Sequence, residues 1–172
     1  MPALPPPRTP GRYRIALVCL GNICRSPMAD VVLSDRVAAA GLGDRVTVVS
    51  SGTGDWHVGG PMDRRAAGVL TREGYDATTH RAQQVRASWL TECDVVLAMD
   101  RENLRDLRAL GTDAAEPERL RLFGDFDPLE PGAEVPDPYF GDGDGFETVL
   151  AMVERTSDAL VTALAAELRG TS

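Results

Sequence analysis

Short apolar runs alternate along this chain with segments in which apolar residues recur at helical spacing. Four runs are typical of buried strands: 14–19, 46–50, 94–99 and 119–123. Helical spacing follows the first three runs, over 26–41, 66–74 and 103–110, and returns over 146–168 near the C-terminal end. Strands that are apolar on both sides and alternate with helices indicate a parallel sheet covered on both faces. We therefore predict an α/β three-layer sandwich with a central four-stranded parallel sheet.

The N-terminal segment has a different composition from the rest of the chain. Five of its first eleven residues are Pro, which predicts a flexible, polyproline-like leader over 1–12. The remainder, 13–169, has an ordinary length for one domain. No apolar run approaches the roughly 18 residues of a membrane span, and the leader lacks the apolar core of a signal peptide. We expect a cytoplasmic protein that does not insert into membranes.

Charge and composition exclude several classes of function. The formal net charge is −8, which argues against a nucleic-acid partner because phosphate backbones require a cationic face. All 18 basic residues are Arg, so lysine-dependent chemistry, including Schiff bases and the lysine of nucleotide-binding loops, is excluded. Three cysteines do not form the framework of a disulfide-rich secreted protein.

Cys19 and Arg25 flank a loop that joins the first predicted strand to the following helix. Ser26 before Pro27 predicts the start of that helix, with Ser26 as its N-cap. The free N–H groups of a helix N-terminus favour anions, and Gly21 permits a close approach or an unusual backbone angle. The planar fork of Arg25 suits two phosphate oxygens, and the same positive field favours the thiolate form of Cys19. The loop therefore predicts a phosphate site with a thiolate nucleophile.

The string VCLGNICRSP at 18–27 resembles the signature loop of the low-molecular-weight protein tyrosine phosphatases. This resemblance implies hydrolysis of phosphotyrosine, and of small aryl phosphates, through a cysteinyl-phosphate intermediate with release of inorganic phosphate. It makes Cys19 the nucleophile and Arg25 the second catalytic residue, with a phosphotyrosine-containing protein as substrate and neither a metal nor another cofactor. The residues that would hold the phosphoryl group are Leu20, Gly21, Asn22, Ile23, Cys24 and Ser26.

A tyrosyl leaving group needs an acid, because phenolate departs poorly. Asp137 lies between two prolines that stiffen its segment, and PDPYF at 136–140 resembles the family's Asp-Pro-Tyr-aromatic element before the last helix. We predict that Asp137 is the general acid and then the base for the hydrolytic water. By the same resemblance, Trp56 would stack on the substrate's phenyl ring with Tyr139 facing it.

Three more residues resemble the family's structural supports of the loop: Ser50, His80 and Asp100. His80 is expected to be a hydrogen-bond partner near Asn22, whereas Gln83 stands where the family usually has Arg. The resemblance also implies a reversible disulfide between Cys19 and Cys24 under oxidants, which would protect the nucleophile. A buried, purely structural Cys24 is the alternative.

Three other functions share parts of this loop. Thiol-dependent arsenate reductases have a close pair of additional cysteines after the region of the third strand. Beyond the loop, this chain has only Cys93. Protein arginine phosphatases have Thr at the position of Ile23, and an apolar side chain there favours an aryl ester. A non-catalytic phosphotyrosine reader needs neither a nucleophile nor an acid, so the joint presence of Cys19, Arg25 and Asp137 argues against it.

Overall fold

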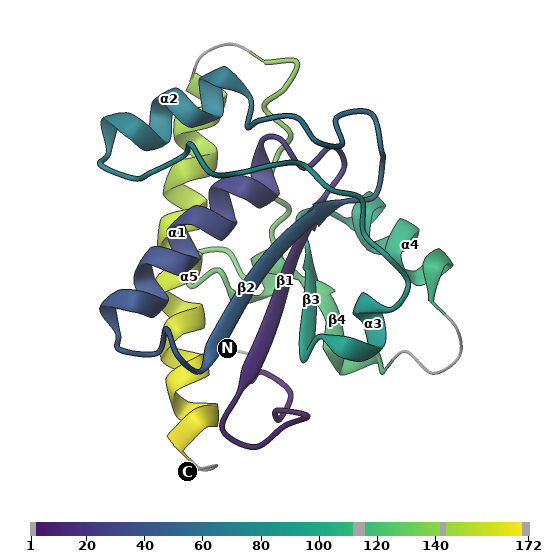
Figure 1. Cartoon of the computed structure of the whole chain (residues 1–172). Helices are drawn as coiled ribbons and strands as arrows, with labels where there is room; N and C mark the ends of the chain where they lie inside the picture. Colours follow the sequence, from purple (N-terminus) through teal and green to yellow (C-terminus); the bar gives the residue numbers. More distant parts are fainter. Residues whose placement is uncertain (1–2, 112–115, 142–143, 170–172) are drawn as a thin grey trace.

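A computed structural model of the chain describes residues 3–111, 116–141 and 144–169. A four-stranded parallel sheet separates two layers of helices, as predicted, with helices α1, α2 and α5 on one face and α3 and α4 on the other (Figure 1). The elements are β1 (Tyr13–Cys19), α1 (Arg25–Ala39), β2 (Val46–Gly52), α2 (Arg64–Arg72), α3 (Trp89–Glu92), β3 (Val95–Ala98), α4 (Arg101–Leu110), β4 (Leu120–Leu122) and α5 (Asp144–Arg169), with 3-10 turns at Pro117–Arg119 and Phe123–Phe126.

The sheet has the strand order β2-β1-β3-β4, so β1 lies in its interior. Side chains along β1 alternate between the two helical layers: Ile15 and Leu17 pack with α1 and α5, and Ala16 and Val18 pack with α3 and α4. This alternation explains why the strand is apolar on both sides. Cys19 pairs in register with Gly52, so the ends of β1 and β2 meet at one edge of the sheet.

The first helix begins two residues earlier than its sequence suggests, and Ser26 is not its N-cap. Helix α1 starts at Arg25 with Cys24 in the N-cap position, and no side chain caps it. The Ser26 hydroxyl is instead turned toward Cys19, at an Oγ–Sγ distance of 3.0 Å. The Ser-Pro pair favours an N-cap at Ser26, but the Ser26 hydroxyl instead makes a tertiary contact with Cys19 at the end of β1.

The described part of the N-terminal segment packs against the domain. Leu4 is only 3% exposed and belongs to the same apolar core as α1 and α5. The Tyr13 hydroxyl donates to the Pro5 carbonyl at 2.9 Å. These contacts differ from the flexible leader that we predicted for 1–12, whose first two residues lie outside the described part, because proline content does not reveal that one leucine fits the core. The domain boundary itself stays a prediction.

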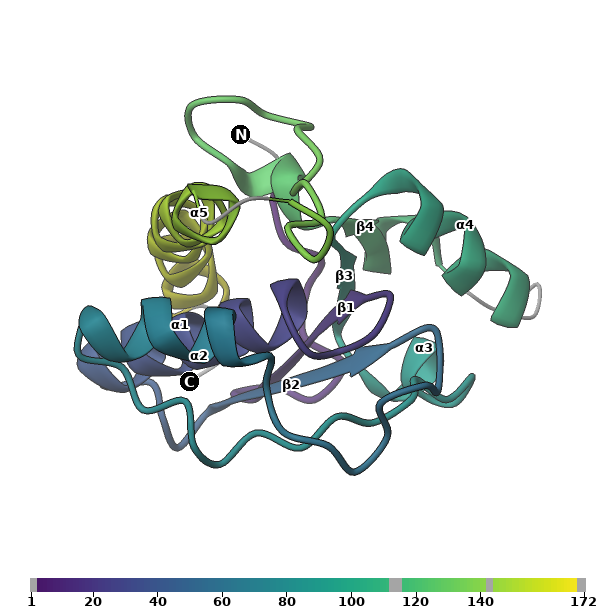
Figure 2. The ribbon, with the colours of Figure 1, turned by 90° about the horizontal axis from the view of Figure 1, so that it is seen from above.

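Seen from above, α1, α2 and α5 lie on one side of the sheet and α3 and α4 on the other (Figure 2). The loops that follow β1, β2 and β3 leave the parallel strands at the same end of the sheet (Figure 1). The four-residue helix α3 was not predicted, because so short a segment has no periodicity to detect. Within the described residues, no helix is both long and apolar enough to span a membrane.

Candidate active site

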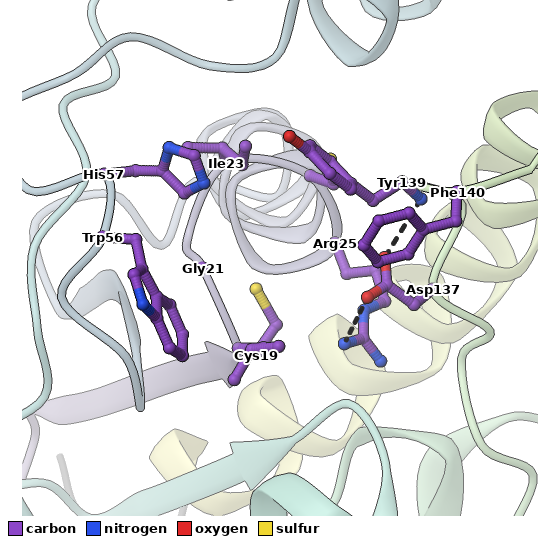
Figure 3. A pocket seen from close by; sticks show the side chains of 11 residues that line it. Cys19, Gly21, Ile23, Arg25, Trp56, His57, Asp137, Tyr139 and Phe140 are labelled. Carbon is purple, nitrogen blue, oxygen red and sulfur yellow. Dashed lines mark hydrogen bonds and ion pairs between the residues drawn. The ribbon is translucent and has the colours of Figure 1, made fainter.

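A hollow of about 250 Å³ opens at the carboxyl ends of the parallel strands, where ligands bind in folds of this type. Cys19 lies at its floor, and the side chains around it come from three loops that are distant in sequence (Figure 3). Its lining residues are Cys19, Leu20, Gly21, Ile23, Cys24, Arg25, Trp56, His57, Asp137, Tyr139 and Phe140. The structure thus brings together most of the residues that the sequence singled out.

The loop after β1 is held in an unusual backbone conformation. Asn22 has a φ of 56°, the left-handed region that non-glycine residues seldom adopt. We expected Gly21 to provide any such angle, but the positive φ falls on Asn22 instead. Gly52 has a different role: a Cβ there would lie 2.6 Å from the Leu20 carbonyl oxygen, so only glycine lets β2 approach the loop.

The Asn22 side chain supplies the hydrogen bonds that compensate for this conformation. Its Nδ2 donates to Ser26 Oγ at 2.9 Å and to Ser50 Oγ at 3.2 Å. Its Oδ1 accepts from the Gln83 N–H at 2.9 Å, and its own N–H points at Cys19 Sγ at 3.3 Å. Asn22 is fully buried, so each of these partners replaces water that cannot reach it.

His80 supports the same loop from outside. Its Nε2 lies 2.6 Å from the Asn22 carbonyl oxygen, and because a carbonyl only accepts, Nε2 carries the hydrogen. Burial lowers the pKa of His80, and the nearby Arg81 charge adds to this, which outweighs the opposing effect of the Asn22 hydrogen bond. His80 is therefore neutral at physiological pH, with its hydrogen on Nε2.

Arg25 is a buried cation at the side of the hollow. Its Nη1 donates to Asp100 Oδ2 at 2.6 Å and to the Val135 carbonyl at 3.0 Å. Its Nη2 lies 3.7 Å from Asp137 Oδ2. Asp100 is also the N-cap of α4, where its other oxygen accepts from the Asn103 N–H. A carboxylate that is fixed by a helix N-terminus therefore orients the guanidinium, and the Val135 carbonyl is a second support that the sequence did not indicate.

Asp137 reaches the hollow from the loop that precedes α5. Its Oδ1 accepts from the Tyr139 N–H at 3.1 Å, which folds the 137–139 turn over the site. Its side chain is 36% exposed, and its Oδ2 is the oxygen nearest Arg25. Asp137 and Arg25 lie on the same side of Cys19 (Figure 3).

Aromatic side chains form the mouth of the hollow. Trp56 lies on the side opposite Tyr139, with Cys19 between and below them (Figure 3). Tyr139 packs edge-to-face against Phe140 at a centroid distance of 4.8 Å. His57, for which we predicted no role, also lines the hollow, and its ring centroid lies 6.4 Å from that of Tyr139. Its place next to Trp56 in the sequence was the only available signal.

Cys24 lies in the wall of the hollow, and the three cysteines are free thiols. Burial raises the pKa of Cys24, and the negative charge of Asp63 raises it further, so Cys24 is a neutral thiol. The Cys19–Cys24 disulfide stays a prediction. Within the described residues, no group of three or more His, Cys, Asp or Glu side chains is arranged to hold a metal ion.

Known proteins match this chain over nearly its whole length. Residues 14–170 match the family model "Low molecular weight phosphotyrosine protein phosphatase". A low molecular weight protein-tyrosine-phosphatase of Streptomyces coelicolor is 44% identical over 92% of this chain and 97% of the relative. Low molecular weight protein-tyrosine phosphatase A of Mycobacterium tuberculosis is 48% identical over 81% of this chain and 84% of the relative.

Solved structures show the same similarity in three dimensions. A protein tyrosine phosphatase from Entamoeba histolytica superposes with a TM-score of 0.83 at 30% identity, over 90% of this chain and 97% of that one. YfkJ from Bacillus subtilis superposes with a TM-score of 0.82 at 32% identity, over 91% of this chain and 96% of that one.

Proposed function

Because this chain belongs to the low molecular weight phosphotyrosine protein phosphatase family, we propose that it hydrolyses phosphotyrosine through a covalent intermediate on Cys19. The chain is an enzyme of the protein-tyrosine-phosphatase class, and its substrates are phosphoproteins. Small aryl phosphates are expected to react as well, because Trp56 and Tyr139 offer aromatic walls to a phenyl ring.

In the first step, the Cys19 thiolate attacks phosphorus and an S–P bond forms. The bond between phosphorus and the tyrosyl oxygen breaks, and Asp137 transfers its proton to that oxygen, so that neutral phenol leaves. Arg25 and the N–H groups of the loop hold the phosphoryl oxygens, over which the negative charge of the transferring group is spread. Arg25 is already oriented by Asp100, so little reorganisation is needed when phosphate binds.

In the second step, water attacks phosphorus and the S–P bond breaks. The Asp137 carboxylate takes a proton from the water, inorganic phosphate forms, and the electron pair of the S–P bond returns to Cys19 as thiolate. The Ser26 hydroxyl, at 3.0 Å from Sγ, donates a hydrogen bond to the departing thiolate. Asp137 ends the cycle protonated and ready for the next substrate.

One observation carries this proposal: Cys19, Arg25 and Asp137 line a single hollow whose mouth is aromatic. An arsenate reductase has no use for a phenyl-sized aromatic mouth, and Ile23, which lines the wall, offers no hydroxyl to a phosphoguanidinium. A phosphotyrosine reader would need the aromatic mouth and Arg25 but not the placement of Asp137 beside them.

The proposal is tested by phosphate release from a phosphotyrosyl peptide, with phosphoserine and phosphoarginine peptides alongside. We expect release from phosphotyrosine alone and none from the Cys19→Ser variant, which should still bind inorganic phosphate. Hydrolysis by Cys19→Ser above background would overturn the covalent route. Binding of the phosphotyrosyl peptide without turnover by the unaltered protein would identify a reader instead.

We also propose a cytoplasmic location and no nucleic-acid partner. The three free thiols fit a reducing compartment, and the net charge of −8 opposes contact with a phosphate backbone.

A further inference from the structure

Arg65, in the first turn of α2, lies between two aromatic rings at the edge of the active site. Its Cζ is 5.4 Å from the Tyr139 ring centroid and 4.7 Å from that of Phe146. Phe146 is buried at the start of α5, whereas Tyr139 lines the mouth of the hollow. The guanidinium therefore connects a fixed ring of the core to a ring that faces substrate, through contacts of the cation–π kind.

Asp63 fixes the orientation of this guanidinium. It accepts from Arg65 Nε and Nη2, both at 3.1 Å, and from the Arg65 N–H at 2.8 Å as the N-cap of α2. Burial alone would raise the pKa of Asp63, but the hydrogen bonds from Arg65 outweigh it and lower the pKa, so Asp63 stays ionised. A two-point contact leaves the planar group little freedom to rotate.

Both ends of this arrangement touch the catalytic loops. The Asp63 N–H donates to the carbonyl of Ile23, in the loop that follows Cys19, at 2.9 Å. At the other end, the Tyr139 N–H donates to Asp137 Oδ1 at 3.1 Å. A continuous set of contacts therefore runs from the nucleophile's loop, through Asp63 and Arg65, to the segment that carries the proposed acid.

We propose that Arg65 is a positioning residue, which holds the Tyr139 segment so that Asp137 faces the leaving oxygen above Cys19. This inference rests on the proposed function, and it adds a residue that does not line the hollow. The Asp137 carboxyl is partly exposed and its loop contains no regular secondary structure, so its position depends on side-chain contacts. The contact between the Arg65 guanidinium and the Tyr139 ring limits how far this loop moves. Without Arg65, the loop should spend more time away from the position in which proton transfer occurs.

Leaving groups of different acidity distinguish positioning from simple charge attraction. Phenyl phosphate and para-nitrophenyl phosphate carry the same ring and phosphate, but phenolate needs a proton on departure far more than nitrophenolate does. Arg65→Met removes the charge and the fork while keeping a long side chain. We expect its kcat/KM to fall about threefold to tenfold with phenyl phosphate and to change less than about twofold with para-nitrophenyl phosphate.

The neighbouring Arg64 offers a matched control, because it is exposed and is not among the residues that line the hollow. Arg64→Met removes the same charge one residue away and should leave both substrates within about twofold of the unaltered enzyme. Arg65→Lys retains a cation over the rings but loses the two-point contact with Asp63, so its activity on phenyl phosphate should lie between those of Arg65→Met and the unaltered enzyme.

The outcomes distinguish failure of the proposed function from failure of the positioning role of Arg65. If the unaltered enzyme releases no phosphate from either substrate, the proposed function fails and the role of Arg65 fails with it. If the unaltered enzyme is active, equal losses on both substrates, or identical behaviour of Arg65→Met and Arg64→Met, overturn the positioning role alone. Thermal unfolding is measured for each variant. Should Arg65→Met not fold, Arg65→Lys decides, and a phenyl-to-nitrophenyl ratio equal to that of the unaltered enzyme refutes the inference.

Discussion

Removal of the Ser26 hydroxyl tests how the buried hydrogen bonds next to Cys19 contribute to turnover. Ser26 is fully buried, its Oγ lies 3.0 Å from Cys19 Sγ, and it accepts from Asn22 Nδ2 at 2.9 Å. Ser26→Ala removes the donor to the thiolate, and Asn22 Nδ2 keeps only its bond to Ser50. A hydrogen bond to a charged group contributes about 1.5–3 kcal/mol, which corresponds to a rate factor of roughly 10 to 150.

This loss should fall mainly on the second step. The departing thiolate must accept the electron pair of the S–P bond, and without a donor that charge is less stable. In the first step the thiolate is consumed, so loss of the donor costs less there. We therefore expect the variant to accumulate the cysteinyl-phosphate and to turn over roughly 10 to 150 times more slowly.

Rapid mixing with para-nitrophenyl phosphate measures the two steps separately. We expect Ser26→Ala to release a burst of nitrophenol close to one equivalent per enzyme, followed by a slow steady rate. Ser157→Ala is the matched control, since it deletes the same atom from a fully buried position in α5, where the described residues give that hydroxyl no hydrogen-bond partner. Absence of a burst, with a steady rate within about twofold of Ser157→Ala, would refute the role of the hydroxyl.

Three other substitutions probe the acid, a half-buried carboxyl and the N-terminal segment. Asp137→Asn should slow phosphotyrosine hydrolysis by roughly 10² to 10⁴ and para-nitrophenyl phosphate much less, and equal losses in steady-state assays would argue against proton donation. Burial raises the pKa of Asp30 from 3.8 to about 6, so the folded state loses stability relative to the unfolded chain as pH rises from about 4 to 6. Asp30→Asn should therefore be more stable than the unaltered protein at pH 7 by up to about 3 kcal/mol and should lose that advantage near pH 4. His80 and Asp30 line one cavity, separate from the active-site hollow, and His80 titrates with the opposite effect on stability. Urea unfolding is therefore compared between the two proteins at each pH, and a variant that is less stable at pH 7 contradicts the reasoning. Leu4→Ala should cost about 2–5 kcal/mol if Leu4 packs in the core, whereas an unchanged thermal transition would indicate a detached leader.

The sequence by itself determined the layered fold and the centre of the site. Strand β1 is apolar on both sides because both of its faces are covered, and this pattern is local, so it is readable without coordinates. Cys19 and Arg25 belong to one loop between a strand and a helix, and a short stretch of chain keeps its spacing in any fold that forms both elements. Asp137 was identified from its resemblance to a family element, because nothing in its own neighbourhood distinguishes it from an aspartate in a turn.

Tertiary structure decided which group satisfies which partner. The capping signal at Ser26 was sound as local chemistry, yet its hydroxyl bonds to Cys19, because burial beside the strand end offers a partner there. The left-handed angle falls on Asn22 rather than Gly21, since the amide side chain obtains buried partners that glycine lacks. The stacking of Arg65 on Tyr139 joins segments far apart in the chain. Such contacts are set by how whole elements pack, and a one-dimensional pattern carries no record of which distant side chains share a buried volume.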